Sequence, residues 1–376
     1  MPNKTGTDLT SNRRTFLKTG AGISIAGAGV ALLPSSHLFA QLTKHGSSGS
    51  LSAGDAALLQ FAAAAETLEA DFWLQYNELG GIQEQALLGG SGNPQYTQAL
   101  SNLDGDFPQY VHDNTLDEIT HAQFLNAYLE LNGAQAVNLE KYRTLPGSKA
   151  TGSSGKLRLT NLMQLTIDNS WYTRYRDVTH NPDLDPDFVF PQAVPDLNNG
   201  QFTAIPRTDD DLNPPDHLAA IASTAAFHMP TIEQGGNSLY PSMAQRASSV
   251  EVLRILISIG PAETMHFQTW SDIAADCVSP PLAPLTDPTN GLTFPNLDGL
   301  GAPGLQPNRI MPEPCPFLSR NLPRCSIIRP TMTEGVAMSV VTFLTNMGLF
   351  IGQSAEFFSV MTGLAQAADA AQRQCS

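Results

Sequence analysis

Two copies of the pattern Glu-x-x-His stand out, because a carboxylate and an imidazole three residues apart in a helix lie on one face. One copy is Glu118 with His121, and the other is Glu263 with His266. Apolar residues recur at helical spacing on the stripe that contains each pair, so both acids are predicted to face a core. A buried carboxylate needs a positive partner, and a bound pair of metal ions is the simplest partner for two such pairs.

Four helices are needed to position these side chains. The two Glu-x-x-His pairs fall in predicted helices over 106–132 and 244–276. Two further predicted helices place a glutamate at an inward position. The helix over 55–79, with Asp55 as its N-cap, offers Glu66 or Glu69, and the helix that begins near Asp216 and ends at Gly235-Gly236 offers Glu233.

In chain order the four helices offer Glu66, then Glu118 with His121, then Glu233, then Glu263 with His266. This order resembles the ferritin-like family, whose metal-binding members carry a glutamate on the first and third helices and a Glu-x-x-His pair on the second and fourth. The resemblance implies an all-α fold, a ferritin-like four-helix bundle with one long crossover. It covers about 55–132 and 216–276, and the branch that the chain resembles is that of exported bacterial ferritin-like proteins, which also resemble plant desiccation-related proteins.

The resemblance also implies roles for the six residues. Glu118 and Glu263 would bridge or chelate two metal ions, His121 and His266 would each cap one ion, and Glu66 and Glu233 would be terminal carboxylates. In the family's first helix an aromatic residue follows the ligand glutamate by seven residues, so Trp73 favours Glu66 over Glu69, which would lie outside the ligand set. On the third helix Pro230 and Gly235 leave the register open, and Glu251 is the alternative to Glu233.

Carboxylates with one imidazole per ion suit two iron or manganese ions better than copper or zinc. Such a centre would act on dioxygen or peroxide, and a ferroxidase, a peroxidase and a catalase-like enzyme all stay open. The alternative is a non-catalytic stress or desiccation-related structural protein of the cell envelope, in which hydrogen bonds satisfy the acids. An iron-storage cage is disfavoured because the long extensions would have to fit around a shell, and a homodimer is a candidate assembly.

The first 40 residues predict export. The segment SNRRTFLK, residues 11–18, resembles a twin-arginine signal, and a Gly/Ala-rich apolar stretch and a predicted cleavage site after Ala40 follow it. We therefore expect recognition by the twin-arginine export machinery and a periplasmic or otherwise exported location. Loss of residues 1–40, with four basic residues and one acid, would change the formal net charge from −15 to −18. This acidity disfavours nucleic acid and anionic lipid as partners.

The remaining segments are assigned by composition and periodicity. Residues 41–54 are a flexible lead-in, 55–276 form the bundle with 134–215 as a crossover insertion, and 277–376 form a Pro/Gly-rich extension that ends in one helix over about 333–373. One helix is also predicted in the crossover, near 159–177. The uncharged stretch 335–355 could be a membrane span, but polar residues interrupt it, so a fifth helix packed on the bundle is favoured.

Four cysteines, all after the second Glu-x-x-His pair, are predicted to form disulfides in an oxidising compartment. A cysteine metal site is disfavoured because the sequence contains no C-x-x-C spacing. Three pairings of four cysteines exist, and we favour Cys315 with Cys325 and Cys277 with Cys375.

Overall fold

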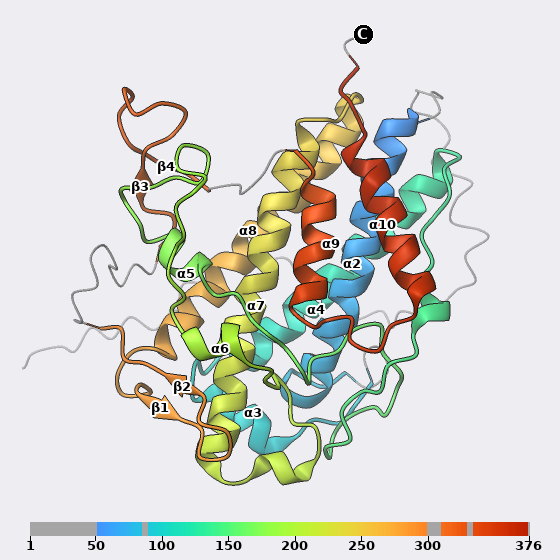
Figure 1. The fold of residues 1–376 in the computed structure, drawn as a ribbon. Helices are drawn as coiled ribbons and strands as arrows, with labels where there is room; N and C mark the ends of the chain where they lie inside the picture. The colour runs from blue at the N-terminus through green and yellow to red at the C-terminus, as the bar shows by residue number, and fades with distance from the viewer. Residues whose placement is uncertain (1–50, 85–88, 299–309, 329–333, 375–376) are drawn as a thin grey trace, which may run out of the picture. The chain divides into compact units, whose positions relative to one another are not determined.

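The computed structural model describes residues 51–84, 89–298, 310–328 and 334–374 (Figure 1). The predicted export signal and Cys375 lie outside the described residues. The all-α prediction is confirmed, because long helices dominate and the described strands are pairs of only two residues each.

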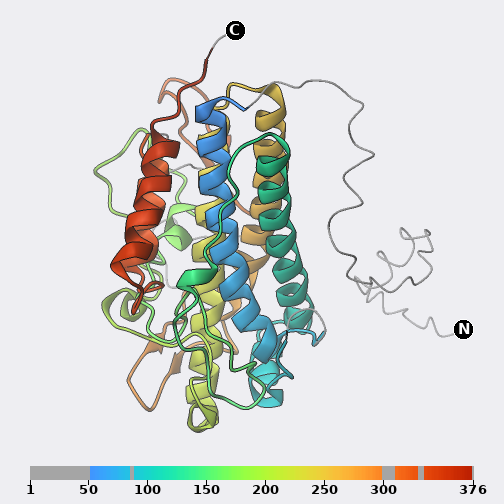
Figure 2. The ribbon, with the colours of Figure 1, turned by 90° about the vertical axis from the view of Figure 1, so that its right-hand side faces the viewer.

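Four long helices form the bundle: α2 (Ala53–Gly80), α4 (Phe107–Leu131), α7 (Pro215–Ala244) and α8 (Val250–Asp276). α2 packs along α4, and α7 packs along α8 (Figure 2). Trp73 of α2 and Trp270 of α8 are buried in the bundle and stack on each other, with their ring centroids 5.2 Å apart. The short helix α3 (Pro94–Ser101) lies between α2 and α4 in the chain.

Asp55 is not the N-cap of α2, and that prediction is wrong. Ser52 takes this place, since its side chain accepts a hydrogen bond of 3.0 Å from the backbone N–H of Asp55. The Asp55 carboxylate instead accepts the backbone N–H groups of Ser248 and Ser249, at 2.9 and 3.0 Å. Ser249 is the N-cap of α8, so Asp55 ties the start of the first bundle helix to the start of the last. α8 thus begins at Val250 rather than near residue 244.

α7 does not end at Gly235-Gly236 as the sequence predicts, but continues to Ala244, with Pro230 and Pro241 inside it. The reason for the glycine at 236 is proximity to a neighbour rather than helix termination. A Cβ atom at Gly236 would lie 2.7 Å from Oε2 of Glu263, so only glycine lets α7 approach α8 this closely.

The crossover contains only short helical turns, η2 (Glu140–Tyr142), α5 (Trp171–Arg174), α6 (Pro195–Asn199) and η3 (Asp209–Leu212). The helix predicted near 159–177 is therefore wrong except at α5. Residues before α5 make their backbone hydrogen bonds to remote segments: the N–H of Asn161 donates to the carbonyl of Leu349, and Leu165 pairs with Phe202. These tertiary hydrogen bonds replace the bonds of a local helix.

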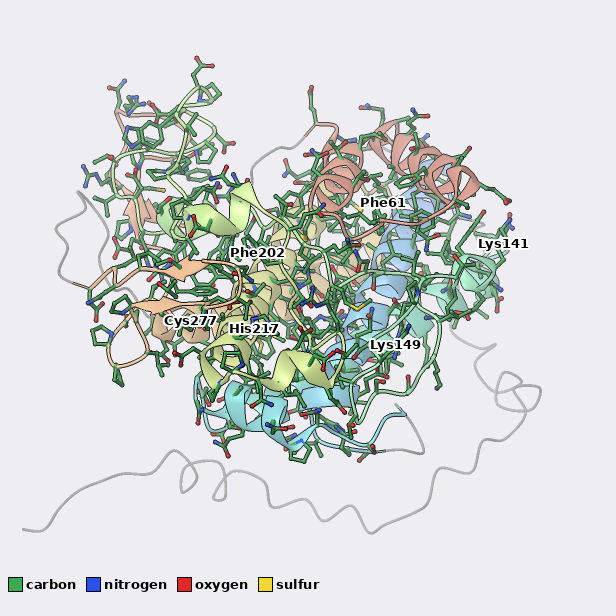
Figure 3. The ribbon with its side chains drawn as sticks, turned by 60° about the horizontal axis from the view of Figure 1, so that its bottom comes forward. Phe61, Lys141, Lys149, Phe202, His217 and Cys277 are labelled. Atoms are coloured by element: carbon green, nitrogen blue, oxygen red, sulfur yellow. The ribbon has the colours of Figure 1, made fainter. Side chains whose placement is uncertain are left out.

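The C-terminal extension carries two antiparallel pairs, β1 (Leu285–Thr286) with β2 (Thr293–Phe294), and β3 (Pro314–Cys315) with β4 (Cys325–Ser326). Figure 3 labels Cys277, which follows the last residue of α8, and His217, which lies at the start of α7. His217 Nδ1 lies 2.7 Å from Asp287 Oδ2, a contact that fastens the β1–β2 segment to the bundle.

Two helices, α9 (Val336–Asn346) and α10 (Ala355–Asp369), replace the single C-terminal helix that the sequence predicts. Gly348 and Gly352 lie between them with φ of 90° and 93°, a left-handed backbone that ends a helix. α10 packs on α2, and α9 contacts α7. Among the described residues, no helix combines the length and the apolar character that a membrane crossing requires.

The structure does not confirm the predicted disulfides. Cys315 and Cys325 lie opposite each other in the β3–β4 pair, but both carry free thiols, as does Cys277. The pairing of Cys277 with Cys375 involves a residue outside the described part of the chain. Both bonds stay predictions.

Candidate metal centre

The six residues singled out in the sequence converge in the middle of the bundle. Their side chains form two overlapping groups, within each of which one ligand atom per residue lies within 4.8 Å of the others. We call Glu66, Glu118, His121 and Glu263 the first half-site, and Glu118, Glu233, Glu263 and His266 the second half-site. Glu118 and Glu263 belong to both groups. Metal binding by these residues stays a prediction.

Both histidines turn the same ring nitrogen toward the acids. His121 Nδ1 lies 3.2 Å from Glu118 Oε2, 3.3 Å from Glu66 Oε2 and 3.4 Å from Glu263 Oε1. His266 Nδ1 lies 3.2 Å from Glu118 Oε1 and 3.3 Å from Glu233 Oε2. Each Nδ1 is therefore the nitrogen that could bind a metal ion.

The four glutamates are at most 1% exposed. Burying a carboxylate costs several kcal/mol unless a positive partner and hydrogen bonds offset the loss of water. Here both carboxylate oxygens of Glu233 and both of Glu263 are buried without a hydrogen-bond partner. Two imidazoles face four buried carboxylates, so the donor set fits a pair of divalent cations, which would supply the remaining positive charge.

The pKa values of the site reflect this excess of buried negative charge. Burial and the Glu66 carboxylate raise the pKa of Glu118 to about 8, and burial together with Glu118 raises the pKa of Glu263 well above its usual range. Burial lowers the pKa of His121, but hydrogen bonds to Glu118 and Glu66 outweigh it and raise the pKa to about 10. Without metal the site therefore holds protons, and a bound cation would have to displace them.

Three further polar residues orient the site and were not predicted. The Tyr240 hydroxyl donates a hydrogen bond to Glu66 Oε1. The Asn114 side chain donates to Glu118 Oε1 at 2.7 Å and accepts from Trp270 Nε1 at 2.7 Å. Asp117 Oδ2 lies 3.0 Å from His266 Nε2, on the side of the ring away from the acids. Such outer contacts fix the orientation of ligand side chains.

The structure resolves two alternatives that the sequence left open. Glu69 belongs to neither half-site and instead lines a small cavity beside Gly235; burial and then the charge of Glu118 raise its pKa well above the usual range. Glu251 is exposed in the first turn of α8, so Glu233 is the acid that reaches the cluster. Glu233 does so because α7 stays helical through Pro230 and Gly235.

Comparison with known proteins agrees with this geometry. The family model described as a ferritin-like domain matches residues 54–275, more than half of the chain and a range that includes all six residues of the two half-sites. Neither curated proteins nor solved structures gave a match to the chain. The chain belongs to the ferritin-like domain family.

Proposed function

We propose that the two half-sites hold two iron or manganese ions, and that the protein is an oxidoreductase acting on dioxygen or peroxide. The observation that carries this proposal is the set of four buried oxygens, on Glu233 and Glu263, that have no hydrogen-bond partner. The contacts to these two carboxylates are those of His266 Nδ1 to Glu233 Oε2, at 3.3 Å, and of His121 Nδ1 to Glu263 Oε1, at 3.4 Å, and a structural protein that kept its acids satisfied by hydrogen bonds would give them more donors.

The donor set supports iron or manganese. Each half-site offers three carboxylates and one imidazole nitrogen, a hard set of ligands without sulfur. Glu118 and Glu263 contribute to both half-sites and would hold the ions as a pair, whereas Glu66 with His121 and Glu233 with His266 would complete one ion each. When bound, such a pair would supply electrons for a reaction with dioxygen or peroxide and would polarise the oxygen atoms.

The protein's own residues prepare the site for such a reaction. Tyr240, 2% exposed, holds Glu66 in place and carries a proton at the edge of the first half-site. Asn114 holds Glu118 through its amide NH2 group and Trp270 through its amide oxygen. The stacked pair of Trp73 and Trp270 packs behind Asn114 and keeps bulk water away from the acids.

Elemental analysis tests the metal proposal. The protein is purified without chelators and compared with the double variant Glu118→Gln, Glu263→Gln, which keeps the side-chain volumes and removes two charges. We expect close to two iron or manganese ions per wild-type chain and close to none in the variant. Dioxygen and peroxide consumption by the loaded protein then tests the catalytic part. Little metal in the wild type, even after anaerobic reconstitution, would favour a structural role in the envelope.

We further propose that the protein is exported by the twin-arginine pathway as a folded, metal-loaded chain that starts at Gln41. The support is the sequence pattern around Arg13 and Arg14 and the apolar stretch after it. Replacing both arginines with lysine should retain the protein in the cytoplasm, whereas Lys4→Gln should not. Export of the twin-lysine variant at the wild-type level would contradict the assignment.

A further inference from the structure

A cavity of about 630 Å³ lies among the crossover, α7 and α9. Its apolar walls include Trp171 and Phe190 of the crossover and Val340 and Phe343 of α9, and α7 contributes Gly235. Val189, another lining residue, is 83% exposed, so the cavity reaches the surface.

A second cavity of about 30 Å³ lies next to the first, between α2, α7 and the α9 segment. Gly235, Val340 and Phe343 line both cavities. The other walls of the second cavity come mainly from α2, with Ala65 and Glu69, and from α7, with Gly236. Its volume is enough for one or two molecules of the size of water, and too small for an organic substrate.

The second cavity lies close to the metal centre, because residues next to the candidate ligands line it. Gly236 lines it, and a Cβ atom at Gly236 would lie only 2.7 Å from Glu263 Oε2. Ala65, on the α2 side, directly precedes Glu66. The bare backbone of Gly236 is therefore what separates this apolar space from a carboxylate that belongs to both half-sites.

We propose that dioxygen reaches the metal centre through these two neighbouring cavities, which share Gly235, Val340 and Phe343 and which we call the α9 passage. The inference rests on the proposed function and narrows its substrate from dioxygen or peroxide to dioxygen. The outer cavity carries polar residues such as Asp168 and Arg174, but the inner one is lined by apolar residues and glycines apart from Glu69, and a small apolar space favours an apolar diatomic molecule over the strongly hydrated peroxide. Because α9 lies outside the matched range 54–275, the passage depends on a segment that this chain adds to the family bundle.

The side of the metal centre where His121 and His266 lie is polar, in contrast to the apolar second cavity. The side chains of His121 and His266 are 15% and 11% exposed, and the exposed Asp117 contacts His266. A polar, acidic surface suits hydrated cations, whereas the α9 passage suits a gas. The two sides therefore separate the route for metal ions from the route for dioxygen.

Gly235 offers a way to block the α9 passage without touching the ligands. A Cβ atom at Gly235 meets no heavy atom within 4 Å, so the side chain of Gly235→Leu would extend into the open space. Val340→Phe narrows the same passage from α9 and serves if the first variant does not fold. The matched contrast is Gly236→Ala, which crowds Glu263 and should lower the metal content itself.

The first readout needs neither metal nor activity: crystals of the protein are pressurised with xenon, which enters small apolar cavities. We expect a xenon atom in the second cavity of the wild type and none in Gly235→Leu. The second readout is the rate at which the reduced, metal-loaded protein reacts with dioxygen in stopped flow. We expect a decrease of at least tenfold in Gly235→Leu or Val340→Phe, with unchanged metal content.

Two results would overturn the α9 passage. One is the absence of xenon from the second cavity of the wild type. The other is a wild-type rate with dioxygen in both blocked variants although they retain their metal. Failure of the proposed function is a separate result, because it would appear as missing metal or missing dioxygen reaction in the wild type, whatever the xenon experiment shows.

Discussion

The two half-sites share Glu118 and Glu263 and use the same nitrogen of their histidines, yet their terminal acids differ. In the first half-site, Glu66 accepts a hydrogen bond from Tyr240. In the second, Glu233 has no hydrogen-bond donor like Tyr240, and its contact is His266 Nδ1, at 3.3 Å from Oε2. The protein therefore holds Glu66 through a hydroxyl as well as an imidazole, and holds Glu233 through an imidazole. The difference indicates that the first half-site is organised before metal binds, whereas the second depends on it.

The largest effect should separate shared acids from terminal acids. Glu263→Gln removes a ligand from both half-sites, so we expect both ions to be lost and the melting temperature of the metal-loaded protein to fall. Glu66→Gln and Glu233→Gln each remove a ligand from one half-site, so one ion should remain. Metal analysis and thermal unfolding of the three variants check this order. Equal metal loss in all three would show that the half-sites do not act as separate ligand groups.

A smaller effect should come from the residues that hold the ligands. Tyr240→Phe removes the hydrogen bond to Glu66, and Asp117→Asn weakens the contact with His266. Each variant should lower the affinity for one ion by about 10- to 100-fold, the range typical of outer contacts at metal sites. Competition titrations with a chelator measure the two affinities. If Tyr240→Phe lowers the affinity for both ions equally, the first half-site is not organised independently of the second, and the comparison between them is wrong.

A buried titratable group outside both half-sites supplies a reference for the cost of burial alone. Burial lowers the pKa of His228 to about 3, and its Nδ1 lies 2.8 Å from the Tyr76 hydroxyl. His228 binds a proton near pH 6.5 in the unfolded chain but not in the folded chain. The contribution of neutral His228 to the unfolding free energy is therefore fully present above pH 6.5 and is lost as the pH falls toward 3. Relative to His228→Asn, the metal-free wild type should lose about 2 kcal/mol of unfolding free energy between pH 7 and pH 5.

Urea unfolding of both proteins at the two pH values measures this difference. The variant keeps a side chain that can pair with Tyr76, so the control isolates the titration of the imidazole. A constant difference between the two proteins across the range would mean that folding does not lower the pKa of His228.

Much of the bundle could be predicted because its information is local. The Glu-x-x-His spacing and the apolar stripe place Glu118 and Glu263 on inward faces without reference to any other segment. The end of α7 could not be predicted, since Gly235-Gly236 is a common termination signal and the reason for Gly236 is the Glu263 carboxylate on another helix. The helix predicted in the crossover was wrong for the same reason, because the backbone N–H of Asn161 donates its hydrogen bond to the remote Leu349.

The contacts around the ligands carried a weaker signal than the ligands themselves. Asn114 lies one helical turn before Glu118, and Tyr240 lies two turns after Glu233, so spacing places each on the face of a candidate ligand. Neither residue type indicates a metal site by itself, and the partner of Tyr240 is Glu66 on a different helix. Only the packed bundle identifies this pair.

Anomalous diffraction from crystals loaded with iron or manganese tests the central claim most directly. The data are collected on both sides of the absorption edge of the metal that is bound. We expect two peaks, one beside Nδ1 of His121 and one beside Nδ1 of His266, with Glu118 and Glu263 in contact with both. A single peak, or peaks away from these residues, would contradict the assignment of two half-sites.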